Sequence, residues 1–307
     1  MIAPPTGQQF PLAHGAQRAV VVELGAGLRE YQTDRGAIVD GFSPEQSPDG
    51  SRGQLLIPWP NRIAGAAYRF GGAEFRLPVT ETRTASAIHG LTRAMPWRLT
   101  TRAAACVTLT LDMPPQGGYP FRLGLAATYS LADDGLTVQV SATNRGDRAC
   151  PFGAGAHPYV RLTTDGLIDD ALLHVPADAI LVTDDRGIPT GAERQVDGTG
   201  FDFRSPRPVG SCVFDTAFTR LHADDDGITR IALTTPDGAQ GVVVWMDRSH
   251  RYAMIYSGDT LDAIARRRRG LAIEPMTCAP DAFNSGAGLI VLQPGETHRS
   301  TWGIAPL

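Results

Sequence analysis

Apolar and polar residues alternate along several segments of the chain. In residues 106–113 (CVTLTLDM) every second residue from Val107 to Met113 is apolar, and residues 136–142 (LTVQVSA) repeat this order. Successive side chains of a β-strand point to opposite faces, so a period of two predicts a strand with one buried face. Both segments are therefore predicted to be half-buried β-strands.

Turn-forming residues separate such segments. Residues 67–77 (AYRFGGAEFRL) consist of two aromatic-bearing runs joined by Gly71 and Gly72. Glycine readily adopts the positive φ of a tight turn, so these residues predict a β-hairpin. The 34 glycines and 23 prolines of the chain fit many short connections between strands.

Helical periodicity is scarce. Its best candidate is residues 259–269 (DTLDAIARRRR), where Leu261, Ile264 and Ala265 have helical spacing. The sequence has no internal repeat and no change of composition that marks a linker. We expect an all-β fold, one large and mainly antiparallel β-sandwich with few short helices, formed by a single domain over residues 1–307.

Composition and charge are those of an ordinary soluble protein. Of the 307 residues, 42% are hydrophobic and 20% are charged, and the formal net charge is −4. So small a charge gives no electrostatic reason to expect nucleic acid or an anionic membrane as a partner. No apolar run approaches the roughly 18 residues of a membrane span. The first residues lack the charged and apolar regions of a signal peptide, so a cytoplasmic protein is expected.

Motifs for metals and nucleotide cofactors are weak. The four cysteines are far apart and form no C-x-x-C pair, which predicts reduced and mostly buried thiols. Residues 23–30 (ELGAGLRE) lack the third glycine of a dinucleotide-binding fingerprint. The basic run at residues 265–270 (ARRRRG) is interpreted as a solvated loop or helix face, because the protein as a whole is acidic.

A few polar side chains stand where chemistry is plausible. His157 lies between small residues and a proline in GAGAHPYV, and His89 precedes a glycine in SAIHGL. Either could instead be a packed or locally hydrogen-bonded histidine, and Arg62, which follows Asn61 in IPWPNRIAG, could be a solvated surface residue. Glu274 ends an apolar run. A carboxylate left dry and unpaired costs several kcal/mol, so Glu274 is predicted to be paired or functional.

Taken in order, these segments resemble the aldose 1-epimerase (galactose mutarotase) family. The segments that carry the resemblance are NRIAGAAYRF, AIHGL, GAGAHPYVRL, FDTAFTRL and IEPMTCAPDAFNSG, and it runs from about residue 15 to the C-terminus. The ordered set is far more specific than any single motif. The family has a large antiparallel β-sandwich, the galactose mutarotase-like supersandwich, with its sugar site in an open cleft. The resemblance thus implies the same fold class as the strand pattern.

The resemblance implies an acid and a base. It places the family's general acid on His157 and its general base on Glu274. Exchange of α- and β-aldoses needs a proton at the ring oxygen and the loss of another from the anomeric hydroxyl. A histidine with a pKa near ~6.5 can donate, and a glutamate with a pKa near ~4.3 can accept. This reaction involves no redox change or group transfer, so no cofactor and no metal are expected.

The resemblance also implies residues that bind a glucose-like or galactose-like substrate. The family's substrate-holding arginine and histidine fall on Arg62 and His89, and Asn61 beside them is included. Its substrate aspartate falls on Asp215, for which Asp247 is a rival. Such side chains would hold sugar hydroxyls by charge-assisted hydrogen bonds.

Three aromatic residues are candidates for an apolar wall against the sugar: Tyr159, Trp245 and Phe283. Each could instead belong to the core. The chain departs from many family members at Met276, where they carry glutamine after the Glu-Pro pair.

Other functions stay open at this point. A sugar-binding module could keep the pocket without catalysis. A glycoside hydrolase would need two flanking carboxylates, and Asp215 with Glu274 could form such a pair. A relative acting on hexose 6-phosphates would need several basic residues at one edge of the cleft, for which Arg93 and the arginines at 266–269 are candidates.

Overall fold

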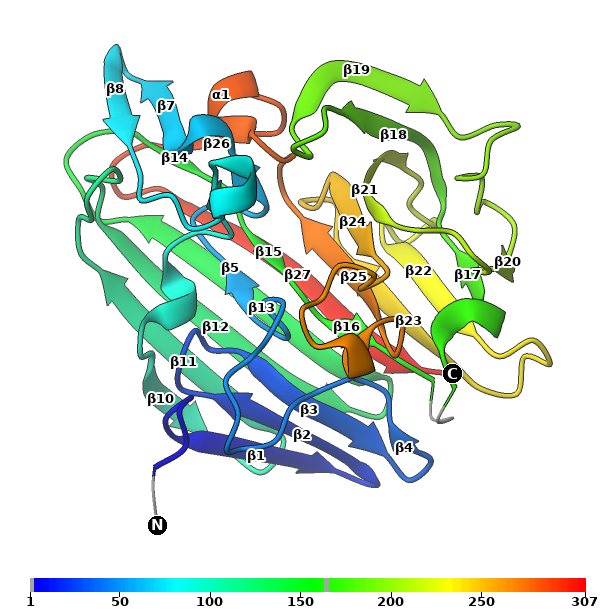
Figure 1. Ribbon diagram of the computed structural model, residues 1–307. Helices are drawn as coiled ribbons and strands as arrows, with labels where there is room; N and C mark the ends of the chain where they lie inside the picture. Colours follow the sequence, from blue (N-terminus) through cyan, green and yellow to red (C-terminus); the bar gives the residue numbers. More distant parts are fainter. Residues whose placement is uncertain (1–2, 163–165) are drawn as a thin grey trace.

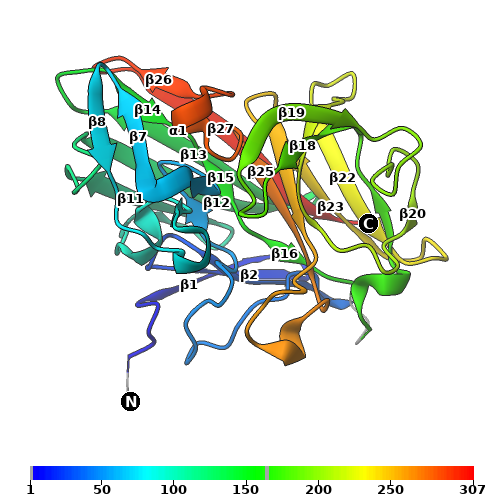
Figure 2. The ribbon, with the colours of Figure 1, turned by 45° about the horizontal axis from the view of Figure 1, so that its top comes forward.

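The computed structural model describes residues 3–162 and 166–307, and two large antiparallel sheets dominate it. The nine-stranded sheet has the order β10-β11-β12-β13-β27-β23-β22-β17-β20. The eight-stranded sheet has the order β19-β18-β21-β24-β25-β15-β5, and β16 also pairs with β25. Figure 1 shows how the strands of both sheets run across the molecule, and Figure 2 shows them after a turn of 45°.

The strands of the nine-stranded sheet, in spatial order, are β10 (Arg98–Arg102), β11 (Cys106–Met113), β12 (Leu123–Ala132), β13 (Gly135–Asn144), β27 (Thr297–Pro306), β23 (Gly241–Met246), β22 (Thr229–Thr234), β17 (Leu172–His174) and β20 (Arg207–Pro208). Those of the eight-stranded sheet are β19 (Pro189–Gln195), β18 (Ala177–Thr183), β21 (Asp215–Leu221), β24 (Tyr252–Tyr256), β25 (Leu271–Met276), β15 (Gly155–Ala156), β5 (Leu55–Leu56) and β16 (Tyr159–Val160).

Smaller elements surround the two sheets. A four-stranded sheet comprises β1 (Gln9–His14), β2 (Gln17–Val22), β3 (Leu28–Thr33) and β4 (Gly36–Ala37). Three strand pairs are β6 (Arg62–Ile63) with β9 (Ala87–Ile88), β7 (Ala67–Phe70) with β8 (Ala73–Arg76), and β14 (Cys150–Phe152) with β26 (Ile290–Leu292). The helices are the 3-10 turns η1 (Ala64–Ala66), η2 (Thr82–Thr84), η3 (Thr92–Ala94), η4 (Ile168–Asp170) and η5 (Ile264–Arg266), and α1 (Ala282–Ser285). Within the described residues, no helix has the length and apolarity to cross a membrane.

Both large sheets bury side chains in one hydrophobic core. Val140 of β13 and Val244 of β23 belong to the same buried cluster as Ile255 of β24 and Ile273 of β25. A β-sandwich forms when two sheets bury their apolar faces against each other. The all-β sandwich expected from the alternating pattern is therefore confirmed.

The strand and hairpin predictions hold in detail. Residues 106–113 form β11, with Val107 and Leu109 buried, and residues 136–142 lie inside β13. Strands β7 and β8 form the expected hairpin, and Gly71 and Gly72 both have positive φ. The alternation and the paired glycines were sufficient signals because both act locally along the chain.

The best helix candidate, residues 259–269, is helical over three residues only. This segment connects β24 to β25 by turns, and its only helical residues are those of η5. Leu261 is buried but Ile264 is 73% exposed, so a helix here would have no continuous apolar face to pack.

The basic run at residues 265–270 is also more than a solvated face. The Arg266 guanidinium donates to the carbonyl of Gly41, and that of Arg268 donates to the carbonyl of Gly210. Arginines of this run therefore hold neighbouring loops in place.

The cysteines behave partly as expected. All four are free thiols; Cys150 and Cys278 are buried, whereas Cys106 and Cys212 are partly exposed. Among residues 3–162 and 166–307, no group of three or more His, Cys, Asp or Glu side chains is arranged to hold a metal ion.

Candidate active site

Strand register brings His157 and Glu274 together. Strands β15 and β16 both pair antiparallel with β25, with Gly155 opposite Met276 and Tyr159 opposite Ala272. These two pairs share one register, so position 157 lies opposite position 274. On β25, Ile273 enters the core, whereas Glu274 lies on the other face of the sheet by the alternation of side chains. The large separation of the two residues in sequence is bridged by one pair of adjacent strands.

The two side chains contact each other out of solvent. His157 Nε2 lies 3.2 Å from Glu274 Oε1, and the side chains are 6% and 2% exposed. His157 Nδ1 and Glu274 Oε2 are buried and have no hydrogen-bond partner within the described protein. Buried polar atoms without a partner are rare because desolvation is costly, and they are typical of sites that bind a ligand.

Burial shifts the pKa of both groups toward the uncharged form. Burial lowers the pKa of His157 from 6.5 to about 3, and the nearby Arg52 and Arg93 cations act in the same direction. Burial raises the pKa of Glu274 well above its ordinary value, and the Asp215 carboxylate adds to this rise. The ordinary pKa values assumed from the sequence therefore do not hold. Burial therefore favours the uncharged form of each group in the free pocket.

Arg62 lies on β6 beside this pair. Its Nε lies 2.6 Å and its Nη2 2.9 Å from the two carboxylate oxygens of Glu81. Its Nη1 lies 3.9 Å from Asp215 Oδ2. The Arg62 side chain is 7% exposed and that of Asp215 is 46% exposed, so the pocket contains a buried cation beside an accessible carboxylate.

Asn61 and His89 fix each other through the pairing of β6 with β9. The main-chain N–H of His89 donates to the main-chain carbonyl of Asn61, and the main-chain N–H of Asn61 donates to His89 Nδ1 at 3.2 Å. The second bond makes Nδ1 an acceptor, so Nε2 carries the ring proton and can donate. Burial holds the pKa of His89 well below 6.5, with neighbouring cations contributing, so the ring is neutral at pH 7.

The ring of Tyr159 packs flat against the imidazole of His157. Its ring stacks on His157 with centroids 4.9 Å apart and planes at 20°, and its hydroxyl donates to the Gly50 carbonyl at 3.0 Å. The Arg52 guanidinium carbon lies 4.1 Å from the centroid of the same ring. Tyr159 thus restrains the imidazole from one side.

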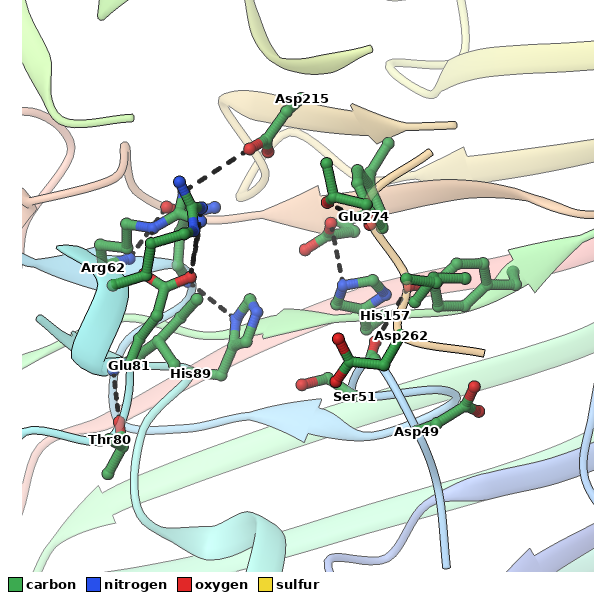
Figure 3. A pocket seen from close by; sticks show the side chains of 18 of the residues that line it. Asp49, Ser51, Arg62, Thr80, Glu81, His89, His157, Asp215, Asp262 and Glu274 are labelled. Carbon is green, nitrogen blue, oxygen red and sulfur yellow. Dashed lines mark hydrogen bonds and ion pairs between the residues drawn. The ribbon is translucent and has the colours of Figure 1, made fainter. Parts of the chain in front are cut away.

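The pocket at these residues has a volume of about 720 Å³, within the range of small-molecule sites. Seven of the site residues named from the sequence line it: Asn61, Arg62, His89, His157, Tyr159, Asp215 and Glu274. In Figure 3, Glu274 faces His157, and Arg62 stands between Glu81 and Asp215. Side chains from separate strands and loops thus converge on one hollow.

Two of the aromatic candidates lie elsewhere. Phe283 of α1 packs edge-on against Trp59 and Tyr68, and Trp245 belongs to β23 of the nine-stranded sheet. Neither lines the pocket. Of the two roles considered for these residues, the core is the one found for Phe283, and Trp245 lies outside the pocket lining.

The rival aspartate and the remaining basic candidates also lie outside the lining. Asp247 accepts hydrogen bonds from the Ser249 amide and the Thr301 amide, and it does not line the pocket. Arg93 and the arginines at 266–269 are likewise not among the lining residues. Met276 is fully buried and packs in a cluster with Ala217 and Met254 rather than in the pocket.

Several lining residues were missed by sequence reasoning. They include Asp49, Ser51, Thr80, Glu81 and Asp262. They belong to loops, where no periodicity or short motif marks a residue as facing a pocket. Only the pairing of distant strands, which a single sequence does not display, brings these loops together.

Comparisons with known proteins identify the family of this chain. The family model described as aldose 1-epimerase matches residues 8–305. A protein of Escherichia coli (strain K12) named YihR is 37% identical over 97% of this chain and 93% of its own length. Maltose epimerase of Levilactobacillus brevis is 30% identical over 78% of this chain and 75% of its own length.

Solved structures share the fold. The GalM/aldose epimerase homologue from C. elegans superposes with a TM-score of 0.85 at 20% identity, covering 97% of this chain and 98% of its own. At this identity the likeness concerns the fold, and the family assignment rests on the sequence match along nearly the whole chain. The chain belongs to the aldose 1-epimerase family.

Proposed function

We propose that this protein is an aldose 1-epimerase that interconverts the α- and β-anomers of aldohexoses by acid-base opening and closure of the sugar ring. The observation that carries the proposal is the contact of His157 with Glu274 at 3.2 Å inside a pocket. The ring oxygen and the anomeric hydroxyl are bonded to one carbon of the sugar. The groups that serve them must therefore be close neighbours, as these two side chains are.

In the proposed reaction His157 is the acid and Glu274 is the base. His157 delivers a proton to the ring oxygen while Glu274 takes the proton of the anomeric hydroxyl, and the bond between the ring oxygen and the anomeric carbon breaks. Rotation about the C1–C2 bond exposes the other face of the aldehyde, and the same two transfers in reverse close the ring. Each positioned proton transfer is typically worth about 10²–10⁴-fold in rate.

The electrostatics of the pair determine which state of the proposed reaction the pocket favours. Opening the ring converts a charged pair, with a protonated imidazole and a carboxylate, into a neutral pair. Burial favours the neutral forms of both His157 and Glu274, so the pocket favours the state that ring opening produces. Direct transfer over the short contact between Nε2 and Oε1 interconverts the two forms without the help of solvent.

The remaining residues are proposed to hold the sugar. Arg62 Nη1 and His89 Nε2 are donors toward hydroxyl oxygens, and the accessible Asp215 carboxylate is an acceptor. Asn61 orders this group, because its Oδ1 accepts the Arg62 amide at 2.9 Å. The stack of Tyr159 on His157 limits the positions that the imidazole can take.

The alternatives find less support. Binding alone would need neither a poised acid nor a matched base. The arginines considered for a sugar phosphate, Arg93 and those at 266–269, do not line the pocket. A hydrolase would need two carboxylates free to flank a glycosidic bond, whereas Glu274 contacts His157.

The test is polarimetry on freshly dissolved sugar. The protein is expected to accelerate the change in optical rotation of α-glucose or α-galactose above the buffer rate, and maltose belongs in the panel because a relative is named maltose epimerase. Binding of sugar without acceleration would favour a binding module. Release of the phenol from an aryl glycoside would favour a hydrolase.

A further inference from the structure

The loop between β8 and β9 supplies a carboxylate that grips Arg62 edge-on. Both oxygens of Glu81 contact the guanidinium, Oε2 at 2.6 Å from Nε and Oε1 at 2.9 Å from Nη2. The hydroxyl of Thr84 also donates to Glu81 Oε2. Two parallel bonds of this kind fix the plane as well as the position of a guanidinium.

This grip leaves one nitrogen of Arg62 for the pocket. With Nε and Nη2 bound to Glu81, only Nη1 faces Asp215, whose Oδ2 is 3.9 Å away. The turn between β18 and β19 approaches the same nitrogen, since a Cβ at Gly187 would lie 2.7 Å from it. Arg62 therefore has little freedom to present another nitrogen.

Glu81 also balances the charge of this edge. Arg62 and Arg83 both line the pocket, and both form ion pairs with Glu81. Asp215 provides the second carboxylate there. With Glu81 present the four side chains sum to no net charge, and without it they carry a net charge of about +1. Burial alone would raise the pKa of Glu81, but its hydrogen bonds to Arg62 and Thr84 keep that pKa below the ordinary value, so Glu81 is ionised at neutral pH.

We propose that Glu81 is a positioning residue of the site, which fixes the single nitrogen that Arg62 offers to a sugar hydroxyl and cancels the positive charge that Arg62 would otherwise present to a ligand. This inference rests on the proposed function for its kinetic readout. It assigns Glu81 no contact with the reacting atoms, so its effect belongs to substrate binding rather than to proton transfer.

Two substitutions separate position from charge. Glu81→Gln removes the charge and the bidentate grip, whereas Glu81→Asp keeps the charge on a shorter side chain. Glu74→Gln is the matched control, because Glu74 forms a comparable ion pair with Arg76 on the exposed hairpin β7–β8 and does not line the pocket. Mutarotation is measured with and without sodium sulfate at constant ionic strength, and circular dichroism checks folding.

For Glu81→Gln we expect KM to rise about tenfold, because a loss of this size corresponds to one charge-assisted hydrogen bond. The kcat should stay within roughly threefold of that of the unsubstituted protein. Sulfate should become a stronger competitive inhibitor, because an uncompensated guanidinium binds anions. Glu81→Asp should raise KM without the added sulfate inhibition, and Glu74→Gln should change neither quantity.

An unchanged KM in both Glu81 variants, or a fall in kcat alone, would overturn the proposal. If Glu81→Gln fails to fold, the sulfate response and KM of Glu81→Asp decide the matter. If the unsubstituted protein shows no mutarotation, the proposed function fails. Calorimetric titration of the same variants with galactose then still tests whether Glu81 controls ligand binding through Arg62.

Discussion

Glu274 Oε1 lies 3.2 Å from His157 Nε2, and each side chain has a second polar atom that is buried without a partner. His157 Nδ1 and Glu274 Oε2 therefore each lack one hydrogen-bond partner. In the proposed complex a sugar hydroxyl and the ring oxygen would supply both. Binding of the sugar would then offset the cost of leaving these atoms unsatisfied in the free protein.

His157→Asn and Glu274→Gln are each expected to remove most mutarotation, about 10²–10⁴-fold in kcat, while the fold persists. Because the two residues act together in one pair of proton transfers, the double variant should be only slightly less active than the less active of the two single variants. Polarimetry measures the rate and circular dichroism the fold. His250→Asn is the matched control, since His250 is buried but pairs with Asp247 away from the pocket. Full activity in either single variant would refute the role assignment.

The pH dependence of kcat/KM should show no inflection near the ordinary histidine value. Burial lowers the pKa of His157 to about 3, so its imidazole takes up no further proton near pH 6.5. Activity should fall well below pH 6.5, where the pair takes up a second proton. An inflection near pH 6.5 in the unsubstituted protein that is absent from the residual activity of His157→Asn would contradict this prediction.

Asp215 and Asp247 should respond differently to the same substitution. Asp215→Asn should raise KM several-fold with little change in melting temperature, because this carboxylate lines the pocket and is half exposed.

Asp247→Asn should instead lower stability and leave KM unchanged. Burial alone would raise the pKa of Asp247, yet hydrogen bonds from His250 and Ser249 lower it to about 2. A carboxylate whose pKa is lower in the folded than in the unfolded state stabilises the protein at pH values above its unfolded-state pKa. That contribution is lost as the pH falls toward 2. Thermal unfolding with saturation kinetics distinguishes the two aspartates, and the opposite pattern would restore Asp247 as the substrate residue.

The free energy of unfolding should decrease as the pH falls below about 6.5, and His89 should contribute to this slope. Burial holds the pKa of His89 well below its unfolded value, so the unfolded chain binds more protons in this range. The limit for one such group is about 1.4 kcal/mol per pH unit.

His89→Asn is the variant that tests this contribution. His89 has a φ of 62°, a conformation that asparagine tolerates, so the backbone should be retained. Denaturant unfolding at several pH values should give a smaller slope for the variant than for the unsubstituted protein. Equal slopes would show that His89 carries no such linkage.

The sequence was informative where the signal is local or ordered along the chain. Alternation found β11, and the glycine pair found the turn between β7 and β8. The ordered motifs identified side chains as distant in sequence as Arg62, His157 and Glu274, which the structure places in one pocket. Their catalytic and binding roles stay predictions until the variants are measured.

The errors arose where tertiary contacts decide. Ile264 has helical spacing from Leu261, but no neighbouring surface buries it. Phe283 was a candidate for the sugar site because of its motif, but its ring packs against Trp59 and Tyr68. Glu81 carries no motif at all, and its relation to Arg62 depends on how the loop after β8 folds back over β6.

The shared register of β15 and β16 against β25 sets a rule for how this chain can change. Gain or loss of one residue within either partner would turn the imidazole or the carboxylate toward the hydrophobic interior. The loops in the long stretch between the two partners carry no such restriction. Insertions there can lengthen loops and reshape the rim, while the spacing inside these short strands must be inherited unaltered.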